Sequence, residues 1–361
     1  MNFSSYIKSN FLKFISRNKV RPLLLTSSPK FLILMNQKIG DMIVCSPILR
    51  EIKIAFPNSN LQVIASQTNK DIALVNPYID NVHIYKNRWH RLLPLLLQFR
   101  RVNFDVAIEL EAKIVTRVIL MLKVIKPNCI LSVTKVVGRY GLAPQDVSPY
   151  DYYTDSKLKH QRDTCLDILR LLNIKCNSKK YDVFYLEKNK KKSLSFLSSF
   201  DSSKIIVGLN ISGSSLEKRI CDDDVKKIIL GLNSMSNDIL IILLHKPEDR
   251  KWTNRLITDD ISSFVFPSYP TDSVLDLAAL VDSVDLIISP DTSLVHMACA
   301  FNKPLVGIYR RDMISFEAWH PKSRCNHVIF SQDFDSLKSI DVNNIVSKTS
   351  ELISTYVKKD L

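Results

Sequence analysis

The stretch Lys38-Ile39-Gly40-Asp41 places a carboxylate a few residues beyond the apolar run 31–35. If that run is a buried strand, Asp41 lies at the open end of a sheet, where a carboxylate can accept the proton of an attacking hydroxyl group. Gly40 would permit a tight turn or the close approach of a ligand. The alternative role for a single Asp at this place is to cap the following helix.

A second group, residues 210–219, has the sequence Asn-Ile-Ser-Gly-Ser-Ser-Leu-Glu-Lys-Arg and follows another apolar run. Its small residues leave backbone N–H groups accessible and two cations follow them, so this loop could hold a diphosphate. The hydroxyl residues are Ser212, Ser214 and Ser215, and the cations are Lys218 and Arg219. The usual nucleotide-binding glycine fingerprints do not occur here. With only seven glycines in the chain, a dinucleotide-binding dehydrogenase is disfavoured.

The third group begins at Asp291-Thr292-Ser293, between the apolar run 286–289 and a helical pattern of small residues. The amides of Thr292 and Ser293 would lie at a helix N-terminus, which is a suitable place for an anion. His296 falls one turn further on, on the same helical face as Thr292. A capped helix with one core histidine explains any one of these residues, but it explains the whole string poorly.

The elements that must position these groups alternate between β-rich apolar runs and helical patterns from about residue 30, which predicts parallel sheets with crossover helices. The first helix is expected to begin at Ser46-Pro47, with Ser46 as its N-cap. A second alternating series starts near Ile205. A chain of 361 residues, 46% of them hydrophobic, suits two domains. We therefore predict an α/β protein with two Rossmann-like domains that face a central cleft. The expected parts are a basic amphipathic segment over 1–29, an N-terminal domain over 30–187, a C-terminal domain over 188–335 and a final helix within 336–361.

Composition narrows the class of protein further. The seven cysteines are scattered and form no Cys-x-x-Cys pair, which disfavours a disulfide framework or a zinc site and favours a reducing compartment. No apolar run is long enough for a transmembrane helix. The net charge of +14 suits a polyanionic partner. Because zinc-finger, RNA-binding and basic–heptad signatures are all missing, we expect phosphorylated lipid and no nucleic acid. Residues 1–25 would form a cationic amphipathic helix on an anionic membrane, or else a frayed basic terminus.

The three groups, in this order and spacing, resemble glycosyltransferase family nine, which contains the ADP-heptose:lipopolysaccharide heptosyltransferases. The stretch from Ile33 to Pro47 is similar to that family's opening strand and Gly-Asp loop, and Pro57, residues 76–80 and residues 160–163 also fit its pattern. The resemblance implies a GT-B type fold and an ADP-sugar donor held by the C-terminal half. It also implies an inverting transfer without a metal or another cofactor.

The resemblance assigns roles residue by residue. Asp41 matches the general base, and Lys218 matches the basic residue near the donor phosphates. Asp291, Thr292 and His296 match the donor-binding motif, and Glu248 matches an acidic residue that holds the ribose. Two departures stand out. Ser293 replaces the family's usual glycine, and Arg310-Arg311-Asp312 replaces Gly-Pro-Thr, so the donor or acceptor could differ from that of well-known members.

The resulting hypothesis is a transferase that moves a heptose or related sugar to a lipopolysaccharide core or a related anionic glycolipid. Its expected place is cytoplasmic, on the inner membrane of a Gram-negative bacterium. Candidate acceptor contacts are Arg88, Arg91, Lys113 and Arg117, and candidate donor contacts include Ser212, Ser214, Ser215 and Ser293. Two rivals remain: a nucleotide-sugar epimerase of similar build, and a non-catalytic basic protein that binds membranes or nucleic acid.

Overall fold

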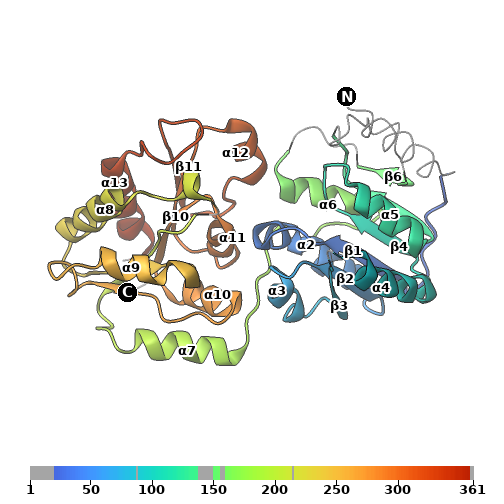
Figure 1. Ribbon diagram of the computed structural model, residues 1–361, viewed down its shortest axis with the longest axis horizontal. Helices are drawn as coiled ribbons and strands as arrows, with labels where there is room; N and C mark the ends of the chain where they lie inside the picture. The colour runs from blue at the N-terminus through green and yellow to red at the C-terminus, as the bar shows by residue number, and fades with distance from the viewer. Residues whose placement is uncertain (1–19, 87, 137–148, 155–158, 214, 358–361) are drawn as a thin grey trace. The chain divides into compact units, whose positions relative to one another are not determined.

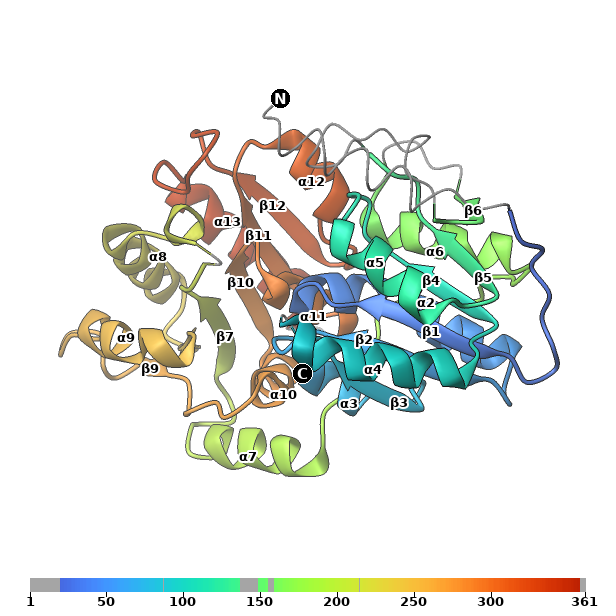
Figure 2. The same cartoon turned by 45° about the vertical axis from the view of Figure 1, so that its right-hand side comes forward.

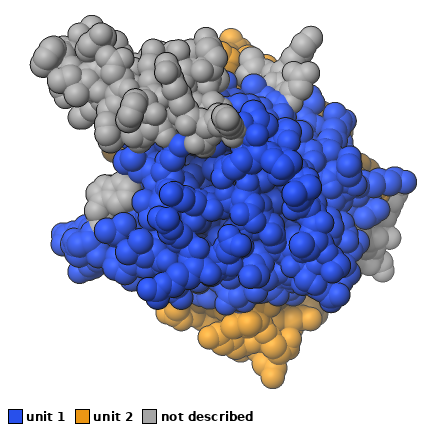
Figure 3. All heavy atoms as spheres, turned by 90° about the vertical axis from the view of Figure 1, so that its right-hand side faces the viewer, with its two compact units in different colours: residues 1–180 blue, residues 181–361 orange. Residues whose placement is uncertain are grey.

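The computed structural model describes residues 20–86, 88–136, 149–154, 159–213 and 215–357. It divides into two compact units, residues 1–180 (unit 1) and 181–361 (unit 2), which are blue and orange in Figure 3. The division falls seven residues before the predicted boundary at 187/188. The reason lies in Tyr181, which is buried and packs its ring against His296 of unit 2 at 6.3 Å between centroids. The predicted amphipathic helix over 1–25 lies almost wholly outside the described residues.

Unit 1 is one parallel sheet of six strands, in the order β3-β2-β1-β4-β5-β6, with helices packed on it (Figure 1). Its strands are β1 (Lys30–Met35), β2 (Asn60–Ala65), β3 (Asn81–Ile84), β4 (Val106–Glu109), β5 (Cys129–Ser132) and β6 (Tyr152–Tyr153). Its helices are α2 (Ile39–Ala55), α3 (Lys70–Leu74), α4 (Trp89–Val102), α5 (Thr116–Ile125) and α6 (Gln161–Leu171). The central strands are apolar on both faces, which is what a sheet covered by helices on both sides requires.

Unit 2 repeats this plan in its own six-stranded parallel sheet, β9-β8-β7-β10-β11-β12 (Figure 2). Its strands are β7 (Ile205–Asn210), β8 (Ile239–Leu244), β9 (Val265–Pro267), β10 (Leu286–Pro290), β11 (Leu305–Tyr309) and β12 (Asn326–Phe330). Its α-helices are α7 (Glu187–Leu197), α8 (Asp222–Met235), α9 (Arg250–Leu256), α10 (Val274–Ser283), α11 (Ser293–Ala300), α12 (Met313–Trp319) and α13 (Val342–Leu352). Short turns η2 (Leu216–Lys218), η3 (Pro247–Asp249) and η4 (Ile353–Val357) complete it. The predicted α/β class with two Rossmann-like domains is confirmed.

Both sheets therefore have the doubly wound strand order, and each has one point where that order reverses. In unit 1 the reversal lies between β1 and β4, which pair in parallel with Leu34 opposite Glu109. In unit 2 it lies between β7 and β10, where Ile288 is opposite Leu209. Ligands of such sheets bind beyond the carboxyl ends of the strands at this point. A ligand site is therefore expected at the segments that leave β1, β4, β7 and β10.

The prediction that the first helix begins at Ser46-Pro47 is wrong, because α2 already begins at Ile39. Pro47 lies inside the helix and has no N–H to give to the carbonyl of Ile43, four residues earlier. The buried Ser46 hydroxyl donates to that carbonyl at 2.7 Å and so replaces the missing bond. Asp41 is consequently a residue of the first helical turn and not of a loop.

The sequence did not predict every structural element. Strand β12 was not predicted, and only one of its five residues is fully buried. Residues 137–148 lie outside the described residues, and β6 is formed by Tyr152 and Tyr153 after them. All seven cysteines are free thiols. Within the described ranges, no helix combines the length and apolar character needed to span a bilayer.

Candidate active site

Asp41 is the third residue of α2, directly beyond the carboxyl end of β1. Its Oδ2 accepts a hydrogen bond from the backbone N–H of Lys38 at 3.1 Å, which caps the start of the helix. The capping role weighed as the alternative for Asp41 is thus present in the structure. The carboxylate is half-buried and keeps a second oxygen for other partners.

Burial raises the pKa of Asp41 above its ordinary value, and the negative charge of Glu111 raises it further. Glu111 lies two residues beyond the end of β4, on the other side of the strand-order reversal. Its own Oε1 accepts from the backbone N–H of Lys113 at 3.2 Å. A carboxylate with a raised pKa binds a proton more strongly than an ordinary Asp, which suits a general base. Sequence reasoning did not single out Glu111.

A buried ionic network supports the same edge of the sheet. Glu109, the last residue of β4, forms an ion pair with Lys135, and both side chains are almost fully buried. Lys135 also donates to the carbonyl of Glu111, and the Ser132 hydroxyl donates to Glu109 Oε2 at 3.0 Å. Lys135 therefore fixes the backbone position of Glu111, whose charge acts on Asp41. The signal in the sequence was an acidic residue ending a buried strand.

The four predicted acceptor contacts lie on two segments of unit 1. Arg88 precedes α4 and Arg91 lies in its first turn, and both are exposed. Lys113 is exposed in the loop after β4, and Arg117 lies in the first turn of α5. Arg117 Nη1 donates to the hydroxyl of Tyr85 at 2.9 Å, which brings α5 close to the segment between β3 and α4. Cations from both segments thus follow strand ends of the same sheet.

In unit 2, Lys218 and Asp291 join the two segments that flank the strand-order reversal. Lys218 ends the turn η2 after β7, and Asp291 directly follows β10. Their Nζ and Oδ2 atoms are 2.5 Å apart, and each side chain is about one-fifth exposed. Gly213 lies against the backbone of Lys218, where a Cβ would overlap the Lys218 carbonyl. The Lys218–Asp291 contact therefore ties the turn after β7 to the residue that follows β10.

The remaining predicted residues of the 210–219 loop have different environments. Ser212 is buried, and its hydroxyl donates to Asp249 Oδ2 at 2.5 Å. Ser215 is exposed at the start of η2, and Ser214 lies outside the described residues. Glu248, the predicted ribose contact, is exposed in η3 beside Asp249. The structure thus links the loop to Asp249, a neighbour that the sequence did not distinguish from Glu248.

The start of α11 is organised by hydroxyl and amide side chains. Asn210, the last residue of β7, donates to Ser289 Oγ at 2.9 Å and to Thr292 Oγ1 at 3.1 Å. Thr292 is the N-cap residue of α11, but its hydroxyl makes no capping bond to the helix backbone. Ser293 is the first residue of the helix. The predicted helix N-terminus therefore exists and lies next to the Lys218–Asp291 pair.

His296 is buried in the interior of unit 2. Its ring lies 6.3 Å from that of Tyr181 and 6.1 Å from that of Trp319. Burial lowers the pKa of His296 to about 4, so the imidazole is neutral near pH 7. Its Nδ1 has no hydrogen-bond partner within the described residues. A neutral ring can still donate or accept one hydrogen bond there.

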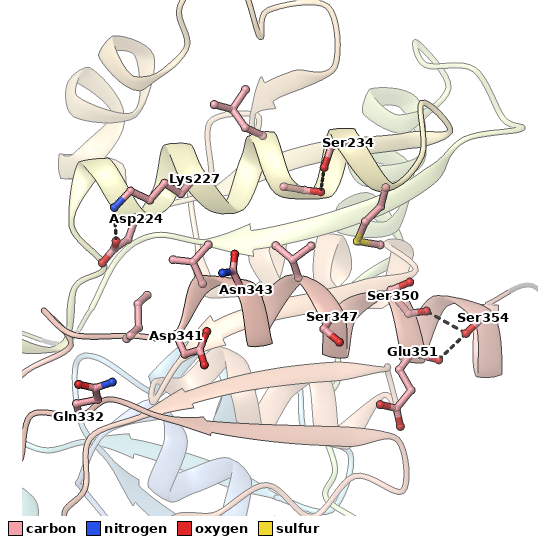
Figure 4. Close-up of a pocket in the computed structure, with 16 residues that line it drawn as sticks. Asp224, Lys227, Ser234, Gln332, Asp341, Asn343, Ser347, Ser350, Glu351 and Ser354 are labelled. Carbon is pink, nitrogen blue, oxygen red and sulfur yellow. Dashed lines mark hydrogen bonds and ion pairs between the residues drawn. The ribbon is translucent and has the colours of Figure 1, made fainter.

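A separate groove lies between α8 and α13, with a volume of about 1110 Å³ (Figure 4). Asp224, Lys227 and Ser347 are among the side chains that line it, and no predicted site residue does. In the described part of the chain, no group of three or more His, Cys, Asp and Glu side chains could hold a metal ion.

Comparison with known families decides the class. The sequence model of glycosyltransferase family 9 (heptosyltransferase) matches residues 103–343, about two thirds of the chain. The chain belongs to glycosyltransferase family 9. As a family 9 protein it is a glycosyltransferase, in agreement with the resemblance seen in its motifs. A relative from Escherichia coli (strain K12), provisionally named lipopolysaccharide heptosyltransferase 4, is 24% identical over 356 residues, which cover 96% of this chain and 94% of the relative.

Solved structures of family 9 proteins share the fold. The glycosyl transferase family 9 protein from Veillonella parvula superposes with a TM-score of 0.74 at 17% identity, covering 93% of this chain and 99% of the other. The E. coli ADP-heptose lps heptosyltransferase II superposes with a TM-score of 0.72 at 14% identity, covering 92% of this chain and 100% of the other. E. coli heptosyltransferase WaaC, solved with ADP, superposes with a TM-score of 0.68 at 16% identity, covering 91% of this chain and 98% of the other. These likenesses identify a GT-B type glycosyltransferase fold.

Proposed function

We propose that this family 9 enzyme transfers a heptose, or a related sugar, from an ADP-sugar to a lipopolysaccharide core or a related anionic glycolipid. One observation supports the proposal: the residues at the strand-order reversals include a carboxylate with a raised pKa, Asp41, in unit 1 and the Lys218–Asp291 ion pair in unit 2. Similarity to the named heptosyltransferase supports the choice of sugar and acceptor.

In the proposed step, an acceptor hydroxyl oxygen attacks the anomeric carbon of the donor and its proton moves to Asp41. The bond between that carbon and the diphosphate oxygen breaks with inversion, and the electron pair leaves with ADP. Lys218 moves from Asp291 to the diphosphate, and the backbone amides at Thr292 and Ser293 add hydrogen bonds. These groups neutralise the leaving group, so the proposal requires no divalent metal.

Further parts of the proposal concern how the substrates are held. Asp249, with Ser212, and Glu248 are assigned to the nucleoside, and His296 supports the first turn of α11. The cations Arg88, Arg91, Lys113 and Arg117 are assigned to the acidic acceptor. Residues 1–25 are assigned to reversible association with the cytoplasmic face of the inner membrane.

The deciding experiment incubates the full chain with ADP-, UDP- and GDP-sugars, with and without a lipopolysaccharide acceptor. Release of ADP that requires the acceptor, with a lengthened glycolipid, supports the proposal. An isomerised donor would identify a nucleotide-sugar epimerase instead. If the protein binds acceptor or membrane but never changes a donor, the transferase proposal is wrong. The Asp41→Asn variant serves as the negative control for transfer.

A further inference from the structure

Helix α4 of unit 1 has one face in the core and one face with leucines in solvent. Leu92, Leu96 and Phe99 are 0%, 0% and 1% exposed and anchor the helix to the sheet. On a neighbouring flank of the helix, Leu93 and Leu97 are 42% and 48% exposed. Residues four apart lie about 40° from one another around a helix, so the two leucines form one stripe. Figures 1 and 2 show α4 beside α5, on the same layer over the sheet.

The chain segment that contains the leucine stripe carries positive charge and no negative charge. From residue 81 to residue 104 the chain has no Asp or Glu, and it has five cations, Lys86, Arg88, Arg91, Arg100 and Arg101. At about 100° per residue, Arg100 falls next to Leu93, and Arg101 falls on the other side of Leu97. Both arginines are exposed.

This combination differs from an ordinary solvent face. Single exposed leucines are common on soluble proteins, but an adjacent pair between exposed arginines has the pattern of a helix that lies in a membrane interface. A protein partner would need an acidic groove with an apolar floor. An anionic bilayer offers negative headgroups directly above an apolar layer, which matches arginines placed beside leucines.

We propose that the outward face of α4, formed by Leu93, Leu97, Arg100 and Arg101, docks on the anionic surface of a lipid bilayer. The leucines enter the boundary between headgroups and acyl chains, and the arginines contact lipid phosphates. Docking through α4 would hold unit 1, with its proposed acceptor contacts, at the surface where a lipid-linked acceptor resides. Only this last point depends on the proposed function, because docking itself needs neither donor nor acceptor.

The test is co-sedimentation of the full chain with vesicles of phosphatidylglycerol and phosphatidylethanolamine, or of phosphatidylcholine alone, at low and high salt. We expect Leu93→Ser with Leu97→Ser to reduce binding to the anionic vesicles at least about tenfold. Leu194→Ser with Leu230→Ser is the matched control, because these leucines of unit 2 are 50% and 51% exposed. Arg100→Gln with Arg101→Gln should reduce both the binding and its salt dependence.

Two readouts distinguish a loss of docking from misfolding and from self-association. The leucine variant should unfold at the wild-type temperature and should transfer sugar to a delipidated, soluble acceptor at the wild-type rate. If the folded leucine variant sediments with anionic vesicles as well as wild type does, α4 is not the docking surface and the membrane proposal for α4 is wrong. If the substitutions instead change self-association in velocity sedimentation without vesicles, the face binds a second copy, which also overturns the proposal.

Discussion

Replacing Asp41 by Asn and by Ala separates its role as a cap of α2 from its proposed role as the general base. In the structure, the backbone N–H of Lys38 donates to Asp41 Oδ2 at 3.1 Å. The side-chain oxygen of Asn can still accept this hydrogen bond, whereas Ala removes it. Neither residue can accept a proton as a base. If Asp41 is the general base, both variants lose turnover, but only the Ala variant loses helix stability.

The expected sizes follow from these contacts. Loss of a general base lowers kcat by about 10²-fold or more, and 10² corresponds to about 2.7 kcal/mol. Loss of a helix cap costs about 1 kcal/mol, or about 2–4 °C in Tm for a unit of this size. Burial raises the pKa of Asp41 in the folded state. The protonated carboxyl therefore favours the folded state at low pH, and this contribution to stability is lost as the pH rises through the folded pKa. Asn avoids this loss, and Asp41→Asn should be at least as stable as wild type at pH 7.

The assay is steady-state transfer over a range of pH, with calorimetric Tm and ADP affinity measured in parallel. Wild-type kcat should fall as the pH drops through the raised pKa of Asp41, because the protonated carboxyl is no base. Glu111→Gln should shift this acidic limb to lower pH, since it removes a negative charge that raises the pKa. An Asn variant within a few-fold of wild-type kcat, or an Ala variant alone inactive, would refute the catalytic role.

Other consequences can be tested in unit 2 and in the core of unit 1. Lys218→Ala should weaken ADP binding at least about tenfold in calorimetry, because it removes the cation beside the anion site, while exposed Lys226→Ala should not. Chelation with EDTA should leave transfer unchanged, and activity restored by Mg²⁺ or Mn²⁺ would contradict the cationic mechanism. Glu51 is fully buried beside Arg50 and accepts from Asn177 N at 2.7 Å. Glu51→Ala should therefore cost about 3–5 kcal/mol and lower Tm by about 10 °C without changing ADP affinity; an unchanged Tm would contradict this.

The sheets could be predicted from sequence because their central strands are continuous apolar runs. The run Ile239–Leu244 consists of six consecutive apolar residues, and it forms the whole of β8, where all six are buried. The start of α2 could not be predicted, because Ser46-Pro47 has the pattern of a helix start and only the bond from Ser46 to Ile43 shows it to be a helix interior. Strand β12 escaped notice because its edge position leaves most of its residues partly exposed.

The residues around the site were predictable where they are neighbours in sequence. The Asp291–His296 string and the loop before Lys218 could be recognised as units, although their pairing across 73 residues needed the structure. Lys135 acts on Glu109 from 26 positions away, and no local pattern marks it. Glu248 and Asp249 are chemically alike in sequence. The turn η3 decides that Asp249, and not Glu248, meets Ser212.

The arginines that replace the family's Gly-Pro-Thr have a structural consequence at the proposed donor site. Arg310 Nη1 donates to the carbonyl of Asp335 at 3.2 Å, and Leu337 of the same loop donates its N–H to the carbonyl of Glu217 at 3.0 Å. Glu217 directly precedes Lys218 in η2. The loops after β7, β11 and β12 are thus tied together, and the tie ends one residue from the lysine that is proposed to meet the diphosphate. We therefore expect Arg310 to influence that lysine only through the backbone of its turn. Its replacement by Gly should change the affinity for the donor by releasing the turn, even though the Lys218–Asp291 pair remains intact.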